Sequence, residues 1–305
     1  MNNRCRLSRR IFNFFASAAL LLSSLSAVAG TVNIVGSNTL EPFMKQWAAA
    51  VAGKVDVNIA TPGTSVGPKA LVQGRADIAA MNREMSNDEL EMFIRQFGYY
   101  PTAIIVAIEP VALYVNPANP LPGLDFDQIE DAFAANHGCN WQDRIHTWGQ
   151  LGLENEWKNA RISLYGHDNK SPVRDFFNKT LLCRDNINAD MKEMNHGQLI
   201  SALAKDKFGL GFSRFDPNSN LKILPIKKGG TQYVPLTVQT VQDRSYKLQH
   251  YLYLYINKPK SGGINSNILE LLKTGLSQPG QAAVSAAGYV PLPADLISRQ
   301  FGKLE

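Results

Sequence analysis

The sequence predicts an α/β protein of two lobes, with mixed sheets flanked by helices. Short strand-like segments alternate with helix-like segments over residues 31–100, which is typical of a parallel or mixed sheet. Two long apolar segments, residues 103–115 and 246–256, separate the two ends of the chain from its middle. The 305-residue chain is long enough for two compact lobes. We therefore expect the two apolar segments to cross between the lobes.

The N-terminal segment resembles an export signal. Four arginines lie within the first ten residues, residues 11–25 are mostly apolar, and Ala27-Val28-Ala29 has the small-x-small form that precedes a cleavage point. The apolar stretch is short and interrupted by serines, so we do not predict a membrane-spanning helix there. We expect a signal peptide over residues 1–29, export by the Sec or the twin-arginine route, and a periplasmic location.

The signal segment accounts for most of the net charge. Removing its four arginines lowers the formal charge of the chain from +5 to +1. No basic face remains that would indicate nucleic-acid binding, and we expect no nucleic-acid partner.

Cysteines and histidines indicate no metal or redox site. Only Cys139 and Cys183 follow the signal segment, and they form either a disulfide or two separate buried thiols. No CxxC motif is present, and the five histidines show no ligand spacing. We expect neither a metal nor a cofactor.

The first strand-like segment, residues 32–35, ends at a turn of small and polar residues. The turn is Gly36-Ser37-Asn38-Thr39, and the helical pattern that follows has Leu40, Phe43, Met44 and Trp47 on one face. Glycine permits an unusual backbone turn, and Ser37, Asn38 or Thr39 could cap the helix. Such a turn suits an anion because it presents N–H groups and hydroxyls. It also fits an ordinary capped strand-to-helix turn.

Similar turns follow the next two strand-like segments. Residues 55–59 lead into a turn that contains Thr64 and Ser65, and residues 76–81 lead into Asn82 and Arg83. We expect a helix from Lys69 to Gly74, and another capped by Ser86 with Glu89 completing a capping box. Because ligands bind at the carboxyl ends of parallel strands, the three turns together favour an anion site.

The remaining elements follow the same patterns. Pro110, in the middle of residues 103–115, suits a strand that passes from one sheet to another. Further strands are predicted at residues 161–165, 209–213 and 246–256. Helices are predicted at residues 124–133, 198–205 and 268–272, and two more helices are predicted to begin near residues 173 and 277. A loop is predicted at residues 148–153.

Several motifs, spread in order over nearly the whole chain after residue 29, resemble the phosphate-binding proteins of phosphate ABC transporters. They are Gly36-Ser37-Asn38-Thr39, Asp77-Ile78-Ala79-Ala80-Met81-Asn82-Arg83, Trp148-Gly149-Gln150-Leu151-Gly152, Leu164-Tyr165-Gly166, Ser277-Gln278-Pro279-Gly280-Gln281 and Gly288-Tyr289-Val290-Pro291-Leu292. The resemblance implies a type II periplasmic-binding-protein fold with a two-strand hinge and ligand held between the lobes.

The same resemblance implies the function and the lobe boundaries. We expect a monomeric, non-enzymatic protein that binds inorganic phosphate or a related tetrahedral oxyanion and delivers it to an inner-membrane ABC permease. We place lobe 1 at residues 30–108 and 250–305, and lobe 2 at residues 109–249.

The resemblance also implies a set of ligand-binding residues. In lobe 1 they are Ser37, Asn38, Thr39, the Leu40 backbone N–H, Thr64, Ser65, Asn82 and Arg83; in lobe 2 they are His167 and Ser171. We expect Thr39 and Thr64 to face the same cleft.

The lobe-2 loop departs from the family pattern. Where relatives have Tyr-Gly-Arg…Ser-Gly-Thr, this chain has Tyr165-Gly166-His167…Ser171-Pro172-Val173. A cleft-facing His167 would titrate near its usual pKa of 6.5, so anion binding would tighten as pH falls. In the alternative, His167 turns away and Lys170 or Arg174 supplies the charge.

Two other functions remain as alternatives. An envelope interaction or sensor protein with weakened or lost phosphate binding would explain the altered loop. A hydrolase has little support, because one loop carrying His167, Asp168 and Ser171 does not usually aim all three side chains at a substrate.

Overall fold

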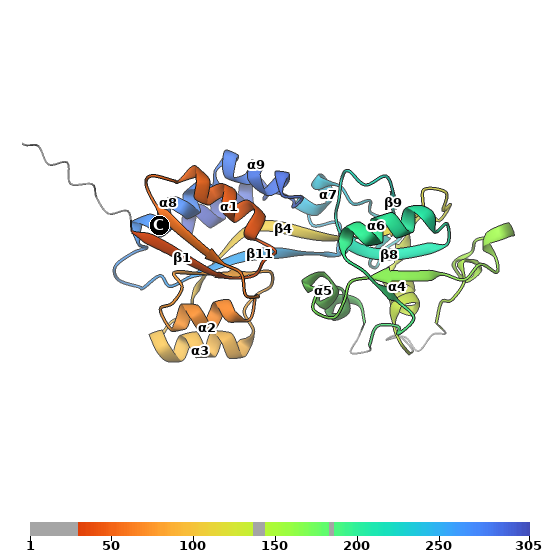
Figure 1. The fold of residues 1–305 in the computed structure, drawn as a ribbon, viewed down its shortest axis with the longest axis horizontal. Helices are drawn as coiled ribbons and strands as arrows, with labels where there is room; N and C mark the ends of the chain where they lie inside the picture. The colour runs from red at the N-terminus through yellow and green to blue at the C-terminus, as the bar shows by residue number, and fades with distance from the viewer. Residues whose placement is uncertain (1–29, 137–143, 183–185) are drawn as a thin grey trace, which may run out of the picture.

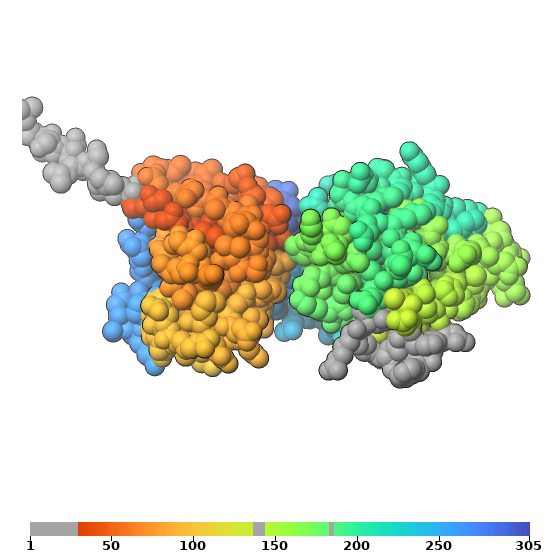
Figure 2. Space-filling view, turned by 60° about the horizontal axis from the view of Figure 1, so that its bottom comes forward, coloured from red at the N-terminus to blue at the C-terminus, as the bar shows by residue number. Residues whose placement is uncertain are grey.

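The computed structural model describes residues 30–136, 144–182 and 186–305. The expected signal peptide lies outside these ranges. Cys139 and Cys183 also lie outside them, so the alternatives of a disulfide or two separate thiols stay a prediction. Figure 1 shows two bodies of chain joined by two long strands, β4 (Thr102–Val115) and β11 (Gln249–Ile256), and Figure 2 shows the same two bodies in a space-filling view. We call the body containing β1–β3 the first lobe and the body containing β6–β8 the second lobe. This is the predicted two-lobed α/β fold.

The first lobe is built on three parallel strands. They are β1 (Thr31–Gly36), β2 (Asp56–Ala60) and β3 (Ile78–Met81), and β1 lies between the other two. β11 pairs antiparallel with β3 and continues the sheet toward the second lobe. The carboxyl ends of β1, β2 and β3 therefore lie at one edge, as the sequence pattern predicted.

Six helices of the described chain belong to the first lobe. They are α1 (Glu41–Ala50), α2 (Val66–Val72), α3 (Asn87–Phe97), α8 (Ser266–Leu276), α9 (Gln278–Ala286) and α10 (Ala294–Gly302). The C-terminal helices return to this lobe, where α8 and α9 contact α1. The indole of Trp47 donates a 2.9 Å hydrogen bond to Gly280 O across this contact. The capping box predicted from Ser86 and Glu89 is confirmed.

Strand β4 changes partner at its proline. It pairs with β11 up to Pro110 and with β8 (Gly209–Arg214) from Val111 onward. Proline has no N–H to donate, so a position where one ladder ends and another begins accommodates it. The prediction that Pro110 marks a passage between sheets is thus confirmed.

The second lobe completes the sheet and covers it with helices. Next to β8 lie β6 (Ser163–Gly166) and β7 (Lys192–Glu193), and β9 (Lys222–Ile223) pairs with β4. A separate pair joins β5 (Leu124–Asp125) to β10 (Ile226–Lys227). The helices are α4 (Phe126–Phe133), α5 (Pro172–Leu181), α6 (His196–Lys205) and α7 (Val238–Gln242), with short 3-10 segments at Trp148–Leu151 and Asn155–Trp157.

Stacked aromatic rings hold α5 on the second-lobe sheet. Phe177 of α5 stacks on Phe212 of β8 with ring centroids 3.8 Å apart, and Phe133 of α4 packs edge-on against both rings. The helix predicted at 124–133 is confirmed from Phe126 onward, with a capping box at Asp125, whereas residues 124–125 belong to strand β5. The predicted loop at 148–153 contains a 3-10 turn, and its Trp148 is buried. Within the described residues, no helix is long and apolar enough to cross a membrane.

Candidate functional site

A cavity of about 400 Å³, which we call the turn pocket, lies between the lobes. The first lobe contributes the turns that follow its three parallel strands, and the second lobe contributes the loop before α5 and its first turn. The lining residues are Ser37, Asn38, Thr61, Pro62, Gly63, Thr64, Ser65, Asn82 and Arg83 from the first lobe, and Asn169, Lys170, Ser171, Pro172 and Asp175 from the second.

Gly36 fixes the path of the first turn. Its φ is +152°, and a Cβ placed there would lie 2.0 Å from Ala80 O, so no other residue fits without a backbone shift. Ser37 N donates to Ala80 O at 2.8 Å, and Gly63 N donates to Gly36 O at 3.0 Å. These bonds join the turns after β1 and β2 to the end of β3.

Thr64 and Asn82 meet in this pocket from different turns. The Thr64 hydroxyl donates a 2.5 Å hydrogen bond to Asn82 Oδ1, and Asn82 is 8% exposed. With that oxygen occupied, the amide nitrogen of Asn82 is a donor for an anion, and the Thr64 oxygen can accept a proton from a protonated one. The pair thus provides one donor and one acceptor at the same place.

The second lobe presents a loop tied by Asp168. Lys170 N donates to Asp168 Oδ1 at 3.0 Å and Ser171 N donates to Asp168 O at 3.1 Å, which shapes the chain just before Pro172 begins α5. Lys170 is exposed, and among the described residues no carboxylate pairs with its ammonium group. It is therefore a cation that an anion in the turn pocket can use.

Both arginines near the turn pocket are already paired. Arg83 forms two hydrogen bonds with Glu89, at 2.7 and 2.9 Å, and these raise the pKa of Arg83 further. Arg174 pairs with Glu193 and donates to His167 O at 3.0 Å. Arg174 does not line the turn pocket. Neither guanidinium offers an uncompensated charge to a ligand.

The structure places His167 away from the turn pocket. Its Nε2 lies 2.8 Å from Ser213 Oγ, which His196 Nδ1 also approaches to 2.8 Å. Burial lowers the pKa of His167 to about 4, with a smaller effect from His196. The expectation that His167 meets the ligand and titrates near pH 6.5 is therefore corrected. Its contact with Ser213 joins residues 46 positions apart, which no local pattern could indicate.

Thr39 and Leu40 also do not line the turn pocket. Thr39 N donates to Ser37 Oγ at 3.2 Å, and its carbonyl accepts a 2.7 Å hydrogen bond from the Tyr289 hydroxyl. The side chain of Leu40 is fully buried in the core. Leu40 is also the N-cap of α1, which has no side-chain cap, so the expected capping by Ser37, Asn38 or Thr39 was wrong.

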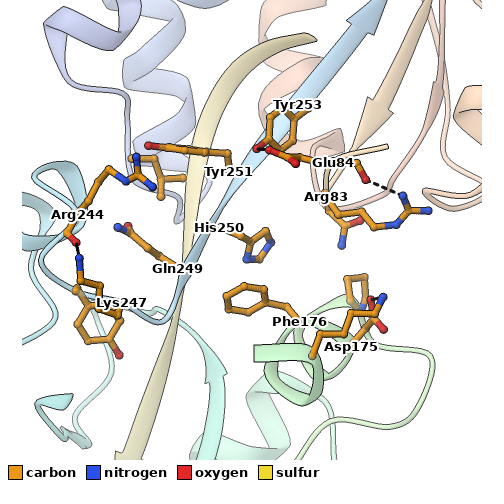
Figure 3. A pocket seen from close by; sticks show the side chains of 15 residues that line it. Arg83, Glu84, Asp175, Phe176, Arg244, Lys247, Gln249, His250, Tyr251 and Tyr253 are labelled. Atoms are coloured by element: carbon orange, nitrogen blue, oxygen red, sulfur yellow. Dashed lines mark hydrogen bonds and ion pairs between the residues drawn. The ribbon is translucent and has the colours of Figure 1, made fainter. Parts of the chain in front are cut away.

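A second cavity, which we call the hinge chamber, has a volume of about 350 Å³ and adjoins the turn pocket. The two share Asn82, Arg83, Pro172 and Asp175. Figure 3 shows its walls, which come from the end of β3, from α5, from β11 and from the segment before β11. Sequence reasoning missed this chamber, although the alternating tyrosines of β11 were visible as a pattern.

No arrangement for catalysis or metal binding emerges in the part of the chain that the structure describes. Ser213, His196 and Asp216 lie in a row, with His196 Nε2 3.4 Å from Asp216 Oδ2. Ser213 is fully buried and its hydroxyl is shared by two imidazoles, so it cannot reach a substrate. No cluster of three or more potential metal ligands occurs among these residues.

Comparisons with known proteins agree on one family. Residues 23–273 match the family model of the PBP superfamily domain. The phosphate-binding protein PstS of Pseudomonas aeruginosa is 30% identical over 285 residues, covering 92% of this chain and 88% of the relative.

Solved structures give the same fold. A possible phosphate binding protein from Planctomyces limnophilus superposes with a TM-score of 0.70 at 22% identity, covering 91% of this chain and 98% of the other. An ABC-type phosphate transport receptor from Vibrio cholerae superposes with a TM-score of 0.65 at 17% identity, covering 86% and 100%.

Proposed function

This chain belongs to the PBP superfamily and, within it, to the family of phosphate-binding proteins PstS, and from this premise we propose that it binds inorganic phosphate or a related tetrahedral oxyanion in the turn pocket. The binding residues we propose are Ser37, Asn38, Thr64, Ser65, Asn82 and Ser171, with Lys170 as the nearby charge. Arg83, which also lines the pocket, contributes only if it leaves Glu89.

One observation carries this proposal. The turns after β1, β2 and β3 and the loop before α5 line a single cavity, although they are far apart in the sequence. They bring hydroxyls, an amide and one unpaired ammonium group to the same space. Such groups bind a tetrahedral oxyanion through many hydrogen bonds. Each hydrogen bond that involves a charged group contributes roughly 1.5–3 kcal/mol.

The charge balance of the pocket predicts its affinity. Relatives place an arginine where this chain has His167, and here His167 is turned into the second lobe. Losing a bidentate guanidinium while retaining one exposed lysine weakens dianion binding. We therefore expect an affinity below that of an arginine-containing site, by about tenfold or more for each charge-assisted bond lost.

We further propose that the protein works as an exported, monomeric and non-enzymatic receptor in the periplasm. It would deliver its ligand to an inner-membrane ABC permease, as the family's role in transport supports. The lobe boundaries we propose lie near residues 108 and 250, where β4 leaves the first lobe and β11 returns to it. Closure of the lobes about these strands would bring the loop before α5 onto the anion.

Calorimetric titration of the stripped protein with phosphate, sulfate, arsenate and molybdate tests the proposal. We expect saturable binding of phosphate, weakened about tenfold in a Ser171→Ala variant because one hydrogen bond to the anion is lost. Ser201→Ala is the matched control, because Ser201 is exposed on α6 and its hydroxyl bonds only Gly197 O. Submicromolar phosphate binding favours transport.

A second function is an envelope interaction or sensor protein with weakened or lost phosphate binding. The pairing of Arg83 with Glu89 and of Arg174 with Glu193 favours it, because both consume charge that a tight anion site would use. Absence of binding for all four oxyanions in the titration would support this function and overturn the first.

A further inference from the structure

The hinge chamber has a lining unlike that of the turn pocket. Figure 3 shows Tyr251 and Tyr253 of β11 on one side and Phe176 of α5 on the other. The ring centroids of Tyr251 and Tyr253 are 6.3 Å apart at an interplanar angle of 86°, and the ring centroids of Phe176 and His250 are 4.3 Å apart. Aromatic walls of this kind favour a flat apolar group.

Arg244 supplies a cation at the edge of these rings. Its guanidinium carbon lies 5.6 Å from the centroid of the Tyr251 ring, within the range of a cation–π contact. Its φ is +66°, a conformation that a residue with a long side chain rarely adopts. The Lys247 ammonium donates a 2.7 Å hydrogen bond to Arg244 O and so holds this strained backbone. Strain of this kind is concentrated at functional sites.

The charges in the hinge chamber are unevenly compensated. Asp175 pairs with Lys179 at 2.7 Å, and Glu84 accepts a 2.9 Å hydrogen bond from the Tyr253 hydroxyl. In residues 30–136, 144–182 and 186–305, no carboxylate forms an ion pair with Arg244, whereas Lys247 lies close enough to the exposed carboxylate of Asp243 to help lower the pKa of that group. Arg244 is therefore the cation of the chamber that lacks an ion-pair partner among these residues.

The two cavities adjoin one another. Asn82, Arg83, Pro172 and Asp175 line both, so a molecule that reached from the turn pocket into the hinge chamber would pass these four residues. The chamber of about 350 Å³ falls in the range of small-molecule sites, roughly 300–1,000 Å³, and is much larger than an inorganic oxyanion needs.

We propose that the hinge chamber is a second subsite that binds the aromatic group of an aryl or heteroaryl phosphate monoester, whose phosphoryl group lies in the turn pocket. This deepens the proposed function, on which it rests. The ring contacts Tyr251 and Phe176, and Arg244 lies over its face or against a polar substituent. The ester oxygen, which links the ring to the phosphoryl group, lies at the residues that line both cavities.

Titration with inorganic phosphate, methyl phosphate and phenyl phosphate tests this proposal on the mature protein. We expect phenyl phosphate to bind at least tenfold more tightly than methyl phosphate and to compete with inorganic phosphate. This gain in affinity over methyl phosphate would come from burial of one aromatic ring and from a cation–π contact.

Two variants test whether Tyr251 and Arg244 provide the added affinity for phenyl phosphate. Tyr251→Ala and Arg244→Asn should each reduce the preference for phenyl over methyl phosphate to about twofold or less, while the affinity for methyl phosphate stays within twofold. Asparagine is chosen because it tolerates a positive φ. Tyr100→Ala is the control for tyrosine removal, since Tyr100 is 68% exposed and does not line either cavity.

The outcomes separate this proposal from the proposed function. If inorganic phosphate binds and phenyl phosphate has no advantage over methyl phosphate, the second subsite is refuted and the oxyanion site stands. An advantage that survives in Tyr251→Ala and Arg244→Asn also refutes it. If neither phosphate nor any ester binds, both proposals fail.

Discussion

The hydroxyl of Thr64 and Oδ1 of Asn82 lie 2.5 Å apart, which joins the turn after β2 to the residue after β3. The bond orients the Asn82 amide so that its nitrogen remains available to an anion. Because of this contact, a charged side chain at position 82 would change which anions the pocket prefers.

Replacing Asn82 with aspartate should make the site selective for protonated oxyanions. A carboxylate repels sulfate but accepts the proton of hydrogen phosphate, so Asn82→Asp should lower sulfate affinity by about tenfold to a hundredfold while phosphate affinity falls less. Calorimetry with both anions measures the ratio. Asn218→Asp adds the same charge at an exposed position outside the cleft and should change neither. Equal losses for the two anions would contradict this prediction.

Releasing Arg83 should strengthen anion binding. Glu89→Gln removes the carboxylate that holds Arg83 but keeps an amide oxygen for the capping box at the start of α3. The freed guanidinium lines the turn pocket, so we expect phosphate affinity to rise by about tenfold and to become more salt-dependent. Glu91→Gln, exposed on the same helix, makes the same change in net charge and should have no such effect. Unchanged affinity in Glu89→Gln would show that Arg83 stays outside the site.

Acidification should destabilise the fold through His167. The pKa of His167 is about 4 in the folded protein, against 6.5 for an ordinary histidine. Between these values the unfolded chain binds a proton that the folded chain does not, so the free energy of unfolding falls as pH is lowered through this window. The loss is at most about 3 kcal/mol. Burial also lowers the pKa of His196, which acts in the same direction.

Urea unfolding between pH 7 and pH 4 measures this dependence. His167→Gln replaces the imidazole with a group that does not titrate, so its free energy of unfolding should fall less steeply over the window. His146→Gln, at an exposed position, should retain the full slope. If His167→Gln keeps that slope as well, His167 is not the group responsible.

Substitution of Gly36 should disrupt the turns that line the pocket. Gly36→Ala forces a Cβ against Ala80 O at a φ of +152°, and we expect it to destabilise the protein by about 2 kcal/mol or more. Gly302→Ala is the control, because a Cβ there meets no atom within 4 Å and should be neutral or slightly stabilising. Chemical denaturation of both variants makes the comparison. A Gly36→Ala protein as stable as the parent would mean that the turn can take another path.

The sequence by itself determined the order of most of the longer strands and helices and much of the first-lobe site, but it did not predict the two-residue strands or helices α7 and α10. Periodicity and turn residues are local properties, so the ends of β1, β2 and β3, the capping box of Ser86 and the passage of β4 at Pro110 followed from short stretches of chain. Because parallel strands end at a common edge, local patterns also predicted that Ser37, Thr64 and Asn82 would gather there. All three line the turn pocket.

Only the tertiary structure decided what each charged or titratable group does. His167 could be placed in a loop from the sequence, but its contact with Ser213 and its burial depend on how β6 and β8 pair. The pairing of Arg174 with Glu193 and the position of Arg244 over Tyr251 likewise depend on the packing of separate elements. Desolvation and pairing are set by every atom that surrounds a group, and residues distant in sequence supply most of those atoms.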